Sequence, residues 1–327
     1  MRLCWKVLAA ATLLALPALS RAANCTTQAE LLGPDRNALV AAGGQLSEAM
    51  AQQDYAALLA ALLPAEKAEW EGIRGAVEQA VPLVNGGQVQ LRNIYVLDTG
   101  NQAAPADTQF FCSNASGSLT VTITMRALPP GRYAVVLGDA AGAPLGGQWA
   151  IILAWDAAGS GWRLAGLSVR QGMFGGHDGV WYWTHARELA RAGQPWSAWY
   201  CYEAARYLLL PVDLLSSPNL EKLAAEQAQI KASPQDAFPL TLQDGDRTWK
   251  IDAVRLDATL RQADLGVSYE STGVTDPAAV RTEAVAVLSA LLKAQPGLRE
   301  NFHGLWAYAV KDGKRTPVIE LPMAQIP

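Results

Sequence analysis

Apolar residues in the first quarter of the chain recur at helical spacings. From about Asp35 to Val77 they stand three or four positions apart, which is the period of an amphipathic helix. Pro64 and Pro82 interrupt this pattern, and Asn85-Gly86-Gly87 has the composition of a turn. The pattern therefore predicts two or three helices before residue 85.

From Val89 to Arg170 the pattern changes to a period of two, which is typical of strands. In Ser118–Thr124, for example, hydroxyl and apolar side chains alternate, as they do in a strand with one solvated face. Sequential antiparallel strands of this kind would form one curved sheet, and the preceding helices could cover its concave face. The predicted strands are Val89–Val96, Gln109–Cys112, Ser118–Met125, Arg132–Leu137, Gln148–Trp155 and Trp162–Arg170.

The segment Trp181–Asp213 carries four of the 11 Trp residues of the chain. It is predicted to form two helices joined at Ala192-Gly193-Gln194-Pro195, because proline is tolerated in the first turn of a helix. The second helix has apolar side chains on both faces, so we expect it to be buried on both sides. The glycine-rich stretch Gln171–Gly179 is interpreted as a connector, with Asp178 capping the next helix. A further helix is expected from Ser217 to about Ile230.

The pattern changes once more after Ser233–Asp236. Two strand-like segments are followed by a helix that begins at Asp276-Pro277, where the aspartate can cap the first turn. Two further strand-like segments end the chain and pair through a turn at Asp312-Gly313. This is a small β-β-α-β-β unit that resembles no family known to us. Its predicted strands are Trp249–Leu256, Ala263–Tyr269, Phe302–Val310 and Val318–Leu321.

The N-terminal residues 1–22 have the features of a secretory signal peptide. Arg2 and Lys6 precede an apolar run from Val7 to Leu19, and Ser20-Arg21-Ala22 offers small residues at the cleavage site. The run is shorter than the roughly 20 residues of a membrane-spanning helix. We therefore expect an exported protein, in the periplasm or outside the cell, with no membrane span after the signal is removed.

Loss of the signal peptide makes the chain more acidic. The whole chain has 26 Lys and Arg against 30 Asp and Glu, a net charge of −4, and the signal contains three basic and no acidic residues. The mature chain would therefore have a net charge of −7. Because basic residues do not cluster elsewhere, we expect no nucleic-acid partner.

Three cysteines remain after signal removal, and an oxidising compartment would favour a disulfide bond between two of them. Cys25 lies near the mature N-terminus and Cys112 lies in a strand-like segment. Cys201 lies in a helical, aromatic segment and is typical of a small core residue. We predict a Cys25–Cys112 disulfide bond with Cys201 free; three buried thiols are the alternative.

Together these segments predict an α+β fold. An N-terminal cone-like curved antiparallel sheet would be covered by helices, and a central helical hairpin would connect it to the small C-terminal β-β-α-β-β unit. The predicted domain boundaries are 1–22 for the signal peptide, 23–170 for the N-terminal α+β domain, 171–180 for the glycine-rich linker, 181–232 for the hairpin with a capping helix, and 238–327 for the C-terminal unit.

Two segments of the N-terminal domain carry a resemblance to a known superfamily. They are Gln53–Leu59 (QDYAALL) at a helix turn and Gly161–Leu167 (GWRLAGL) in the last strand. With the order of helices followed by strands, residues Ala38 to Arg170 resemble the nuclear transport factor 2-like superfamily, which includes SnoaL-like and ketosteroid isomerase-like proteins. The resemblance implies a cone-shaped fold with a pocket, but no particular reaction, because the superfamily contains enzymes, binding domains and structural domains.

The central hairpin carries a second resemblance. Ala198, Tyr202 and Ala205 stand at spacings that allow close helix packing, after Gly193 and before Pro211. This arrangement resembles one tetratricopeptide repeat. Such arrays need about three repeats to be stable alone, so the resemblance implies a repeat-like hairpin rather than a peptide-binding array.

The sequence offers no catalytic constellation. His185 and Glu188 share a helix face, but no third metal ligand has a suitable spacing, and His303 is expected on the outer face of a strand. There is no Gly-x-Ser-x-Gly nucleophile elbow, and Cys201 has Trp, Tyr and Ala neighbours rather than cationic ones. We therefore assign no catalytic residue, no metal ligand and no cofactor.

The leading functional hypothesis is an exported, non-catalytic binding or scaffold protein. It would contact a small-molecule ligand or a partner protein through the cone pocket or through aromatic surfaces. The alternative is a small-molecule enzyme of the ketosteroid isomerase-like type with a carboxylate inside the cone; a structural homodimer formed through an open sheet face is a third possibility. The candidate contact residues are Trp181, Tyr182, Trp183, Trp196 and Tyr200.

Overall fold

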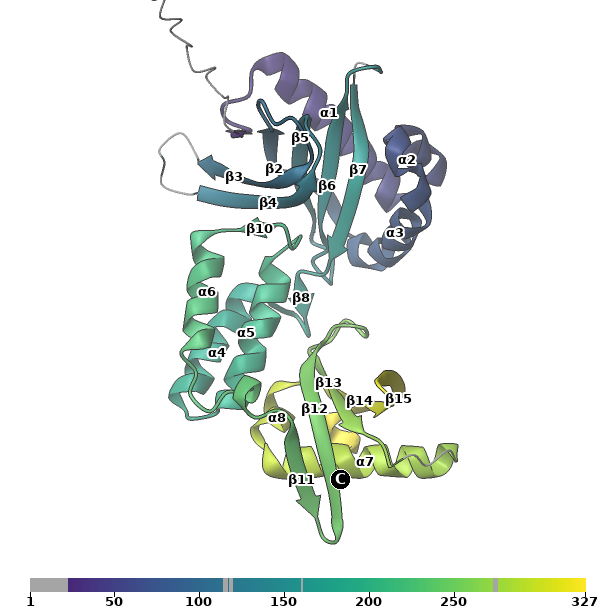
Figure 1. Cartoon of the computed structure of the whole chain (residues 1–327), viewed down its shortest axis with the longest axis vertical. Coiled ribbons are helices and arrows are strands. Elements are labelled where there is room, and N and C mark those ends of the chain that lie inside the picture. The colour runs from purple at the N-terminus through teal and green to yellow at the C-terminus, as the bar shows by residue number, and fades with distance from the viewer. Residues whose placement is uncertain (1–22, 114–116, 118–119, 160, 273–275) are drawn as a thin grey trace, which may run out of the picture.

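The computed structural model of the chain describes residues 23–113, 117, 120–159, 161–272 and 276–327. The predicted signal peptide lies outside these residues. The described residues confirm the α+β class. In Figure 1, three parts of the chain lie in sequence order along the long axis of the molecule. An N-terminal sheet with its helices lies at one end, three helices lie in the middle, and a second sheet lies at the other end.

Three helices cover one face of the N-terminal sheet (Figure 1), as predicted. Their bounds are Gly33–Ala51 (α1), Tyr55–Ala61 (α2) and Trp70–Val84 (α3). Asp54 caps α2 by accepting a hydrogen bond from the backbone of Ala57 at 2.9 Å, and Pro64 begins a 3₁₀ turn before α3. The sheet has five antiparallel strands in the order β1-β2-β5-β6-β7, namely Asn24–Thr27, Gln88–Asp98, Arg132–Ala141, Gln148–Asp156 and Gly161–Arg170.

The strands do not form the single meander that their order suggested. Strand β2 pairs with β5, while the intervening β3 (Ala106–Ser113) and β4 (Thr120–Leu128) form a second small sheet with β10 (Leu215–Ser216). Buried residues succeed one another without alternation at 94–97 in β2 and at 134–136 in β5, so both sheet faces must be covered. Ile94 and Val96 face the helices, whereas Tyr95 and Leu97 pack against β3 and β4. On β2 and β5, the sheet face considered for a homodimer is therefore covered by the chain's own strands.

A disulfide bond joins Cys25 in β1 to Cys112 in β3, with 5.1 Å between the two Cα atoms. This confirms the predicted pairing, and Cys201 is the free, buried cysteine among the described residues. The bond attaches the β3–β4 layer to the first strand of the main sheet. A structural disulfide bond is typical of proteins that fold in an oxidising, exported environment.

The predicted helical hairpin is confirmed as α4 (Gly179–Arg191) and α5 (Pro195–Leu209), followed by α6 (Pro218–Ala228). Asp178 caps α4 by accepting a hydrogen bond from the backbone of Trp181 at 2.8 Å. The connector before it forms a two-stranded ribbon, β8 (Met173–Phe174) and β9 (His177–Asp178). Its tight turn needs positive φ values of 55° and 83°, which Gly175 and Gly176 supply.

The C-terminal unit contains the predicted β-β-α-β-β order and two further elements. The additions are the edge strand β11 (Leu240–Asp244) and the short helix α8 (Gly297–Asn301). The sheet order is β11-β12-β13-β14-β15, and only the β13–β14 pair is parallel, because α7 provides the crossover between these two strands. The remaining bounds are Arg247–Asp257 (β12), Asp264–Glu270 (β13), Pro277–Ala294 (α7), Gly304–Lys311 (β14) and Lys314–Pro322 (β15).

The hairpin and the C-terminal unit share one hydrophobic core. Helix α5 is buried on both sides, as predicted, and packs between α4 and the C-terminal sheet. The ring of Tyr200 meets that of Phe302 edge to face, with 6.2 Å between the centroids, and Trp196 meets Phe238 at 5.7 Å. The aromatic residues of α5 thus join the helices to the sheet.

Candidate functional site

The interior of the N-terminal domain, between its helices and its sheet, is filled by side chains. Leu39, Met50, Leu58, Trp149 and Ile151 are at most 1% exposed there. The polar exception is Ser47, whose hydroxyl accepts a hydrogen bond from the Trp149 indole at 3.0 Å. No Asp or Glu side chain is buried among the described residues of this domain. The carboxylate that an isomerase-like enzyme would use inside the cone is therefore missing from this core.

The five aromatic residues considered for partner contacts have different environments. Trp181 is 40% exposed and stacks between His177 and His185, with centroid distances of 3.8 and 4.7 Å. Trp183 is half-buried, and its indole nitrogen donates a hydrogen bond to Glu226 at 2.8 Å. The other three are at most 6% exposed and belong to the shared core, although Tyr200 also lines a cleft beside α5. They are Tyr182, Trp196 and Tyr200.

A cleft of about 650 Å³ opens where the three parts of the chain meet. Residues of α5 line one part of it, and residues 252–256 of strand β12 line another. The end of β7 and the segment after α5 close it on the N-terminal side. Its lining includes guanidinium groups, carboxylates and aromatic rings: Arg170, Arg206, Arg255, Glu203, Asp252 and Trp199. We call this cavity the α5–β12 cleft.

Arg170 is already paired within the cleft. Its guanidinium donates to the Asp213 carboxylate at 2.6 Å and to the Leu210 carbonyl oxygen at 3.2 Å, and it lies 5.6 Å from the Tyr207 ring centroid. The hydrogen bond from Arg170 holds the pKa of Asp213 below its usual value. The charges of Arg170 and Asp213 therefore neutralise each other, whereas Arg206 and Arg255 are exposed to solvent.

The β12 wall of the cleft contains an unpaired strand edge. Strand β11 pairs with β12 only as far as Ile251, so in the described part of the chain no strand lies on that side of residues 252–257. A β-bulge between Ile251 and Ala253 shifts the register of β12 at the same point. Tyr200 covers part of the edge, since its hydroxyl donates to the Val254 carbonyl oxygen at 3.1 Å. The remainder of the edge lines the cleft.

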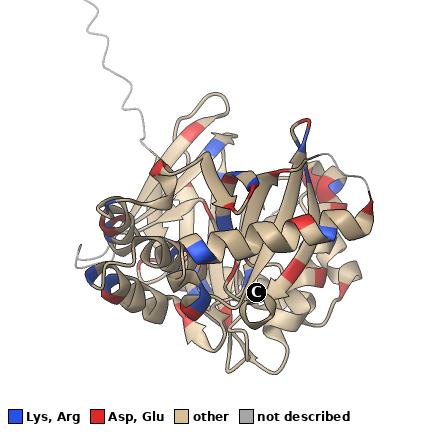
Figure 2. Ribbon diagram, turned by 90° about the horizontal axis from the view of Figure 1, so that it is seen from below, with Lys and Arg blue, Asp and Glu red and all other residues tan. Residues whose placement is uncertain are grey.

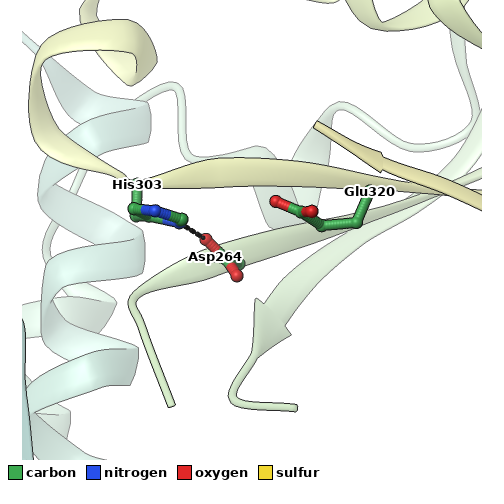
Figure 3. Close-up of side chains that lie close together, drawn as sticks. All are labelled: Asp264, His303 and Glu320. Atoms are coloured by element: carbon green, nitrogen blue, oxygen red, sulfur yellow. Dashed lines mark hydrogen bonds and ion pairs between the residues drawn. The ribbon is translucent and has the colours of Figure 1, made fainter. Parts of the chain in front are cut away.

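A second group of polar side chains lies in the C-terminal sheet (Figure 3). Asp264, His303 and Glu320 each present one potential ligand atom, and these atoms lie within 4.8 Å of one another. The His303 Nδ1 and Asp264 Oδ1 atoms are hydrogen-bonded at 2.9 Å. Burial, together with the nearby Asp264 carboxylate, raises the pKa of Glu320.

Neither site could be found from residue spacing. The cleft is built from four segments, near 170, 199–213, 234–238 and 252–256. The polar group combines positions separated by 39 residues and by 17 residues. One signal was present: Asp264 begins a strand that is buried up to Tyr269, and a buried acidic residue needs a partner.

Charges of both signs are interspersed over the described chain (Figure 2). No described helix is both long enough and apolar enough to span a bilayer. Comparisons with protein-family models, with curated proteins and with solved structures found no match.

Proposed function

We propose that the chain is an exported binding protein that holds an extended segment of a partner polypeptide in the α5–β12 cleft. The observation that carries the proposal is the unpaired edge of β12, residues 252–257, beside a cleft of about 650 Å³. An extended peptide can add to such an edge through backbone hydrogen bonds, while pockets beside it select the side chains.

The chemistry of the lining favours a polypeptide over a uniformly charged or wholly apolar ligand. Exposed Arg206 and Arg255 can pair with acidic side chains, and Glu203 and Asp252 can pair with basic ones. Trp199 and Phe238 add half-buried aromatic surface, which is a common anchor in protein interfaces. A peptide with an apolar residue between charged residues of both signs would match this arrangement.

The same proposal assigns the protein to the periplasm or the extracellular space. The Cys25–Cys112 bond and the predicted signal peptide support this compartment. We interpret residues 23–170 as a nuclear transport factor 2-like domain with a filled interior, and the α4–α5 hairpin as a single tetratricopeptide-like repeat. Their role in the proposal is to hold one end of the cleft in place.

The proposal is tested by selecting ligands from a library of random short peptides displayed on phage, with the purified chain immobilised. A selected peptide is then synthesised with a fluorophore, and its affinity is measured by anisotropy. We expect Arg206→Glu and Arg255→Glu each to weaken binding by about tenfold, which corresponds to about 1.4 kcal/mol. Arg281→Glu, on the exposed side of α7, reverses the same charge away from the cleft and should leave the affinity unchanged.

Hydrogen exchange distinguishes strand addition from other modes of binding. Saturation with the peptide should slow amide exchange at those residues of 252–257 whose amides point away from β13, because only these backbone groups can pair with an added strand. The proposal fails if no peptide is enriched over a blank surface. It also fails if the selected peptide binds both cleft variants as tightly as the original chain.

A further inference from the structure

Asp264 is fully buried yet only partly satisfied. It is the first residue of β13, its side chain is 0% exposed, and one carboxylate oxygen is hydrogen-bonded to His303 Nδ1 at 2.9 Å. The other oxygen, Oδ2, is buried and has no hydrogen-bond partner among the described residues. A buried carboxylate oxygen without a donor or a cation is strongly unfavourable, because burial removes its hydration and nothing replaces it. This oxygen therefore points to a ligand.

Glu320 brings a second unsatisfied oxygen to the same place. It lies on β15, opposite Trp306 of β14, and its Oε1 atom is buried without a hydrogen-bond partner among the described residues. The ligand atoms of Asp264, His303 and Glu320 lie within 4.8 Å of one another, as Figure 3 shows. Two carboxylates this close repel each other when both are ionised, and a bound cation removes the repulsion.

Gly304 keeps the space between these groups open. A Cβ atom at this position would lie 2.9 Å from Glu320 Oε1, 3.2 Å from Asp264 Oδ1 and 2.8 Å from the Leu321 carbonyl oxygen. Any side chain at position 304 would thus occupy the space between the two carboxylates. The position directly follows His303, so one short segment supplies both a nitrogen ligand and the room beside it.

The donor set determines which ion would fit. One imidazole nitrogen and two carboxylate oxygens suit Zn²⁺ and similar divalent transition metals, whereas Ca²⁺ and Mg²⁺ prefer oxygen ligands alone. The side chain of His303 is 44% exposed, so solvent reaches the group from that side and can complete the coordination. Two ligands about 2.0–2.1 Å from a tetrahedral ion stand about 3.3–3.4 Å apart. The His303 Nδ1 and Asp264 Oδ1 atoms, now hydrogen-bonded at 2.9 Å, would therefore have to separate by only about 0.4 Å to bind one ion.

We propose that Asp264, His303 and Glu320 bind one divalent transition-metal ion of the Zn²⁺ class. The ion replaces the proton between His303 and Asp264, and it joins β13 and β15 to the residue that directly precedes β14. This inference is independent of the peptide proposed for the α5–β12 cleft, whose lining contains none of these three residues.

The test uses the full chain after chelation with EDTA and exhaustive dialysis. Titration with Zn²⁺ in a calorimeter should give one site per chain, and Co²⁺ should produce visible d–d absorption. We expect His303→Gln and Glu320→Gln each to weaken Zn²⁺ binding by at least about tenfold. His177→Gln removes an exposed histidine from the β8–β9 ribbon and serves as the matched control.

Folding of the variants can be checked separately from metal binding. Asp264→Asn alters a fully buried side chain and can disturb folding, so the decisive variant is His303→Gln, where the side chain is partly exposed. An unchanged circular dichroism spectrum with lost Zn²⁺ binding supports the site. No saturable binding, or binding that His303→Gln leaves unchanged, would overturn it.

Discussion

Glu226 of α6 accepts two hydrogen bonds from the Arg187 guanidinium of α4, at 2.7 and 3.0 Å. The same carboxylate accepts a hydrogen bond from the Trp183 indole at 2.8 Å, and the Arg187 guanidinium lies 4.5 Å from the Trp183 ring centroid. Glu226 therefore fixes the third helix onto the hairpin. It also holds Trp183 in place. The Trp183 side chain is therefore not part of the free aromatic surface that was predicted from its position in the sequence.

Replacing Glu226 with Gln should destabilise the protein measurably. The substitution keeps the size of the side chain but removes the charge that strengthens the Arg187 and Trp183 hydrogen bonds. We expect the free energy of unfolding to fall by about 1.5–3 kcal/mol, the range for hydrogen bonds to charged groups. Chemical denaturation monitored by Trp fluorescence measures this. Glu221→Gln, on the exposed surface of the same helix, should change it by no more than about 0.5 kcal/mol.

The Arg187–Glu226 pair should make the stability of the protein depend on pH. The hydrogen bond from Arg187 holds the pKa of Glu226 below its ordinary value of 4.5. Because the folded-state pKa is the lower one, the stabilisation is complete above pH 4.5 and is lost as the pH falls through the folded value. The difference in unfolding free energy between the original chain and Glu226→Gln should therefore be constant near neutral pH and shrink below pH 4.5. A difference that grows on acidification would contradict this assignment.

Cys201 should be chemically inert in the folded protein. The side chain is 0% exposed, and burial raises the pKa of its thiol to about 12, so little thiolate is available at pH 8. In a chain that begins at Ala23, we expect iodoacetamide to modify no cysteine in the native state. One cysteine should react after unfolding in guanidinium, and all three after reduction. Modification of Cys201 in the native state at the rate of an exposed thiol would show that α5 opens.

Loss of the Cys25–Cys112 bond should lower stability without changing the fold class. The two residues are 87 positions apart, and the bond joins β1 to the β3–β4 layer. Removing a native disulfide bond from an exported domain typically costs about 2–5 kcal/mol. We expect Cys25→Ser with Cys112→Ser to lower the melting temperature while the far-ultraviolet circular dichroism spectrum is retained. Cys201→Ser is the control for loss of a sulfur atom at a buried site.

Sequence periodicity predicted which segments form helices and strands better than it predicted which strands pair with one another. The Asp178 and Asp276 caps were correct, because capping depends on residues three positions away. The position of β3 and β4 could not be predicted, since the pairing of β2 with β5 depends on contacts about 40 residues apart. Strand β11 was missed because it is short and largely polar.

The candidate sites were harder to predict than the fold for the same reason. His303 and Asp264 each look unremarkable in their own segment, and only the parallel pairing of β13 with β14 brings them to the same end of the sheet. Aromatic content alone did not distinguish core residues from surface residues. Tyr182 and Trp196 are both buried in the core that the hairpin shares with the C-terminal unit.

Tyr200→Phe tests how α5 is joined to the edge of β12. The Tyr200 hydroxyl donates to the Val254 carbonyl oxygen at 3.1 Å, and burial keeps the pKa of this tyrosine above its usual range. The variant keeps the ring in the core but leaves a strand-edge carbonyl without its donor. We expect the free energy of unfolding to fall by about 1 kcal/mol. Tyr207→Phe removes a hydroxyl from a half-buried position two turns along the same helix and should have a smaller effect. If both variants are equally stable, the Val254 carbonyl is already solvated, and the edge of β12 is more open than the hydrogen bond indicates.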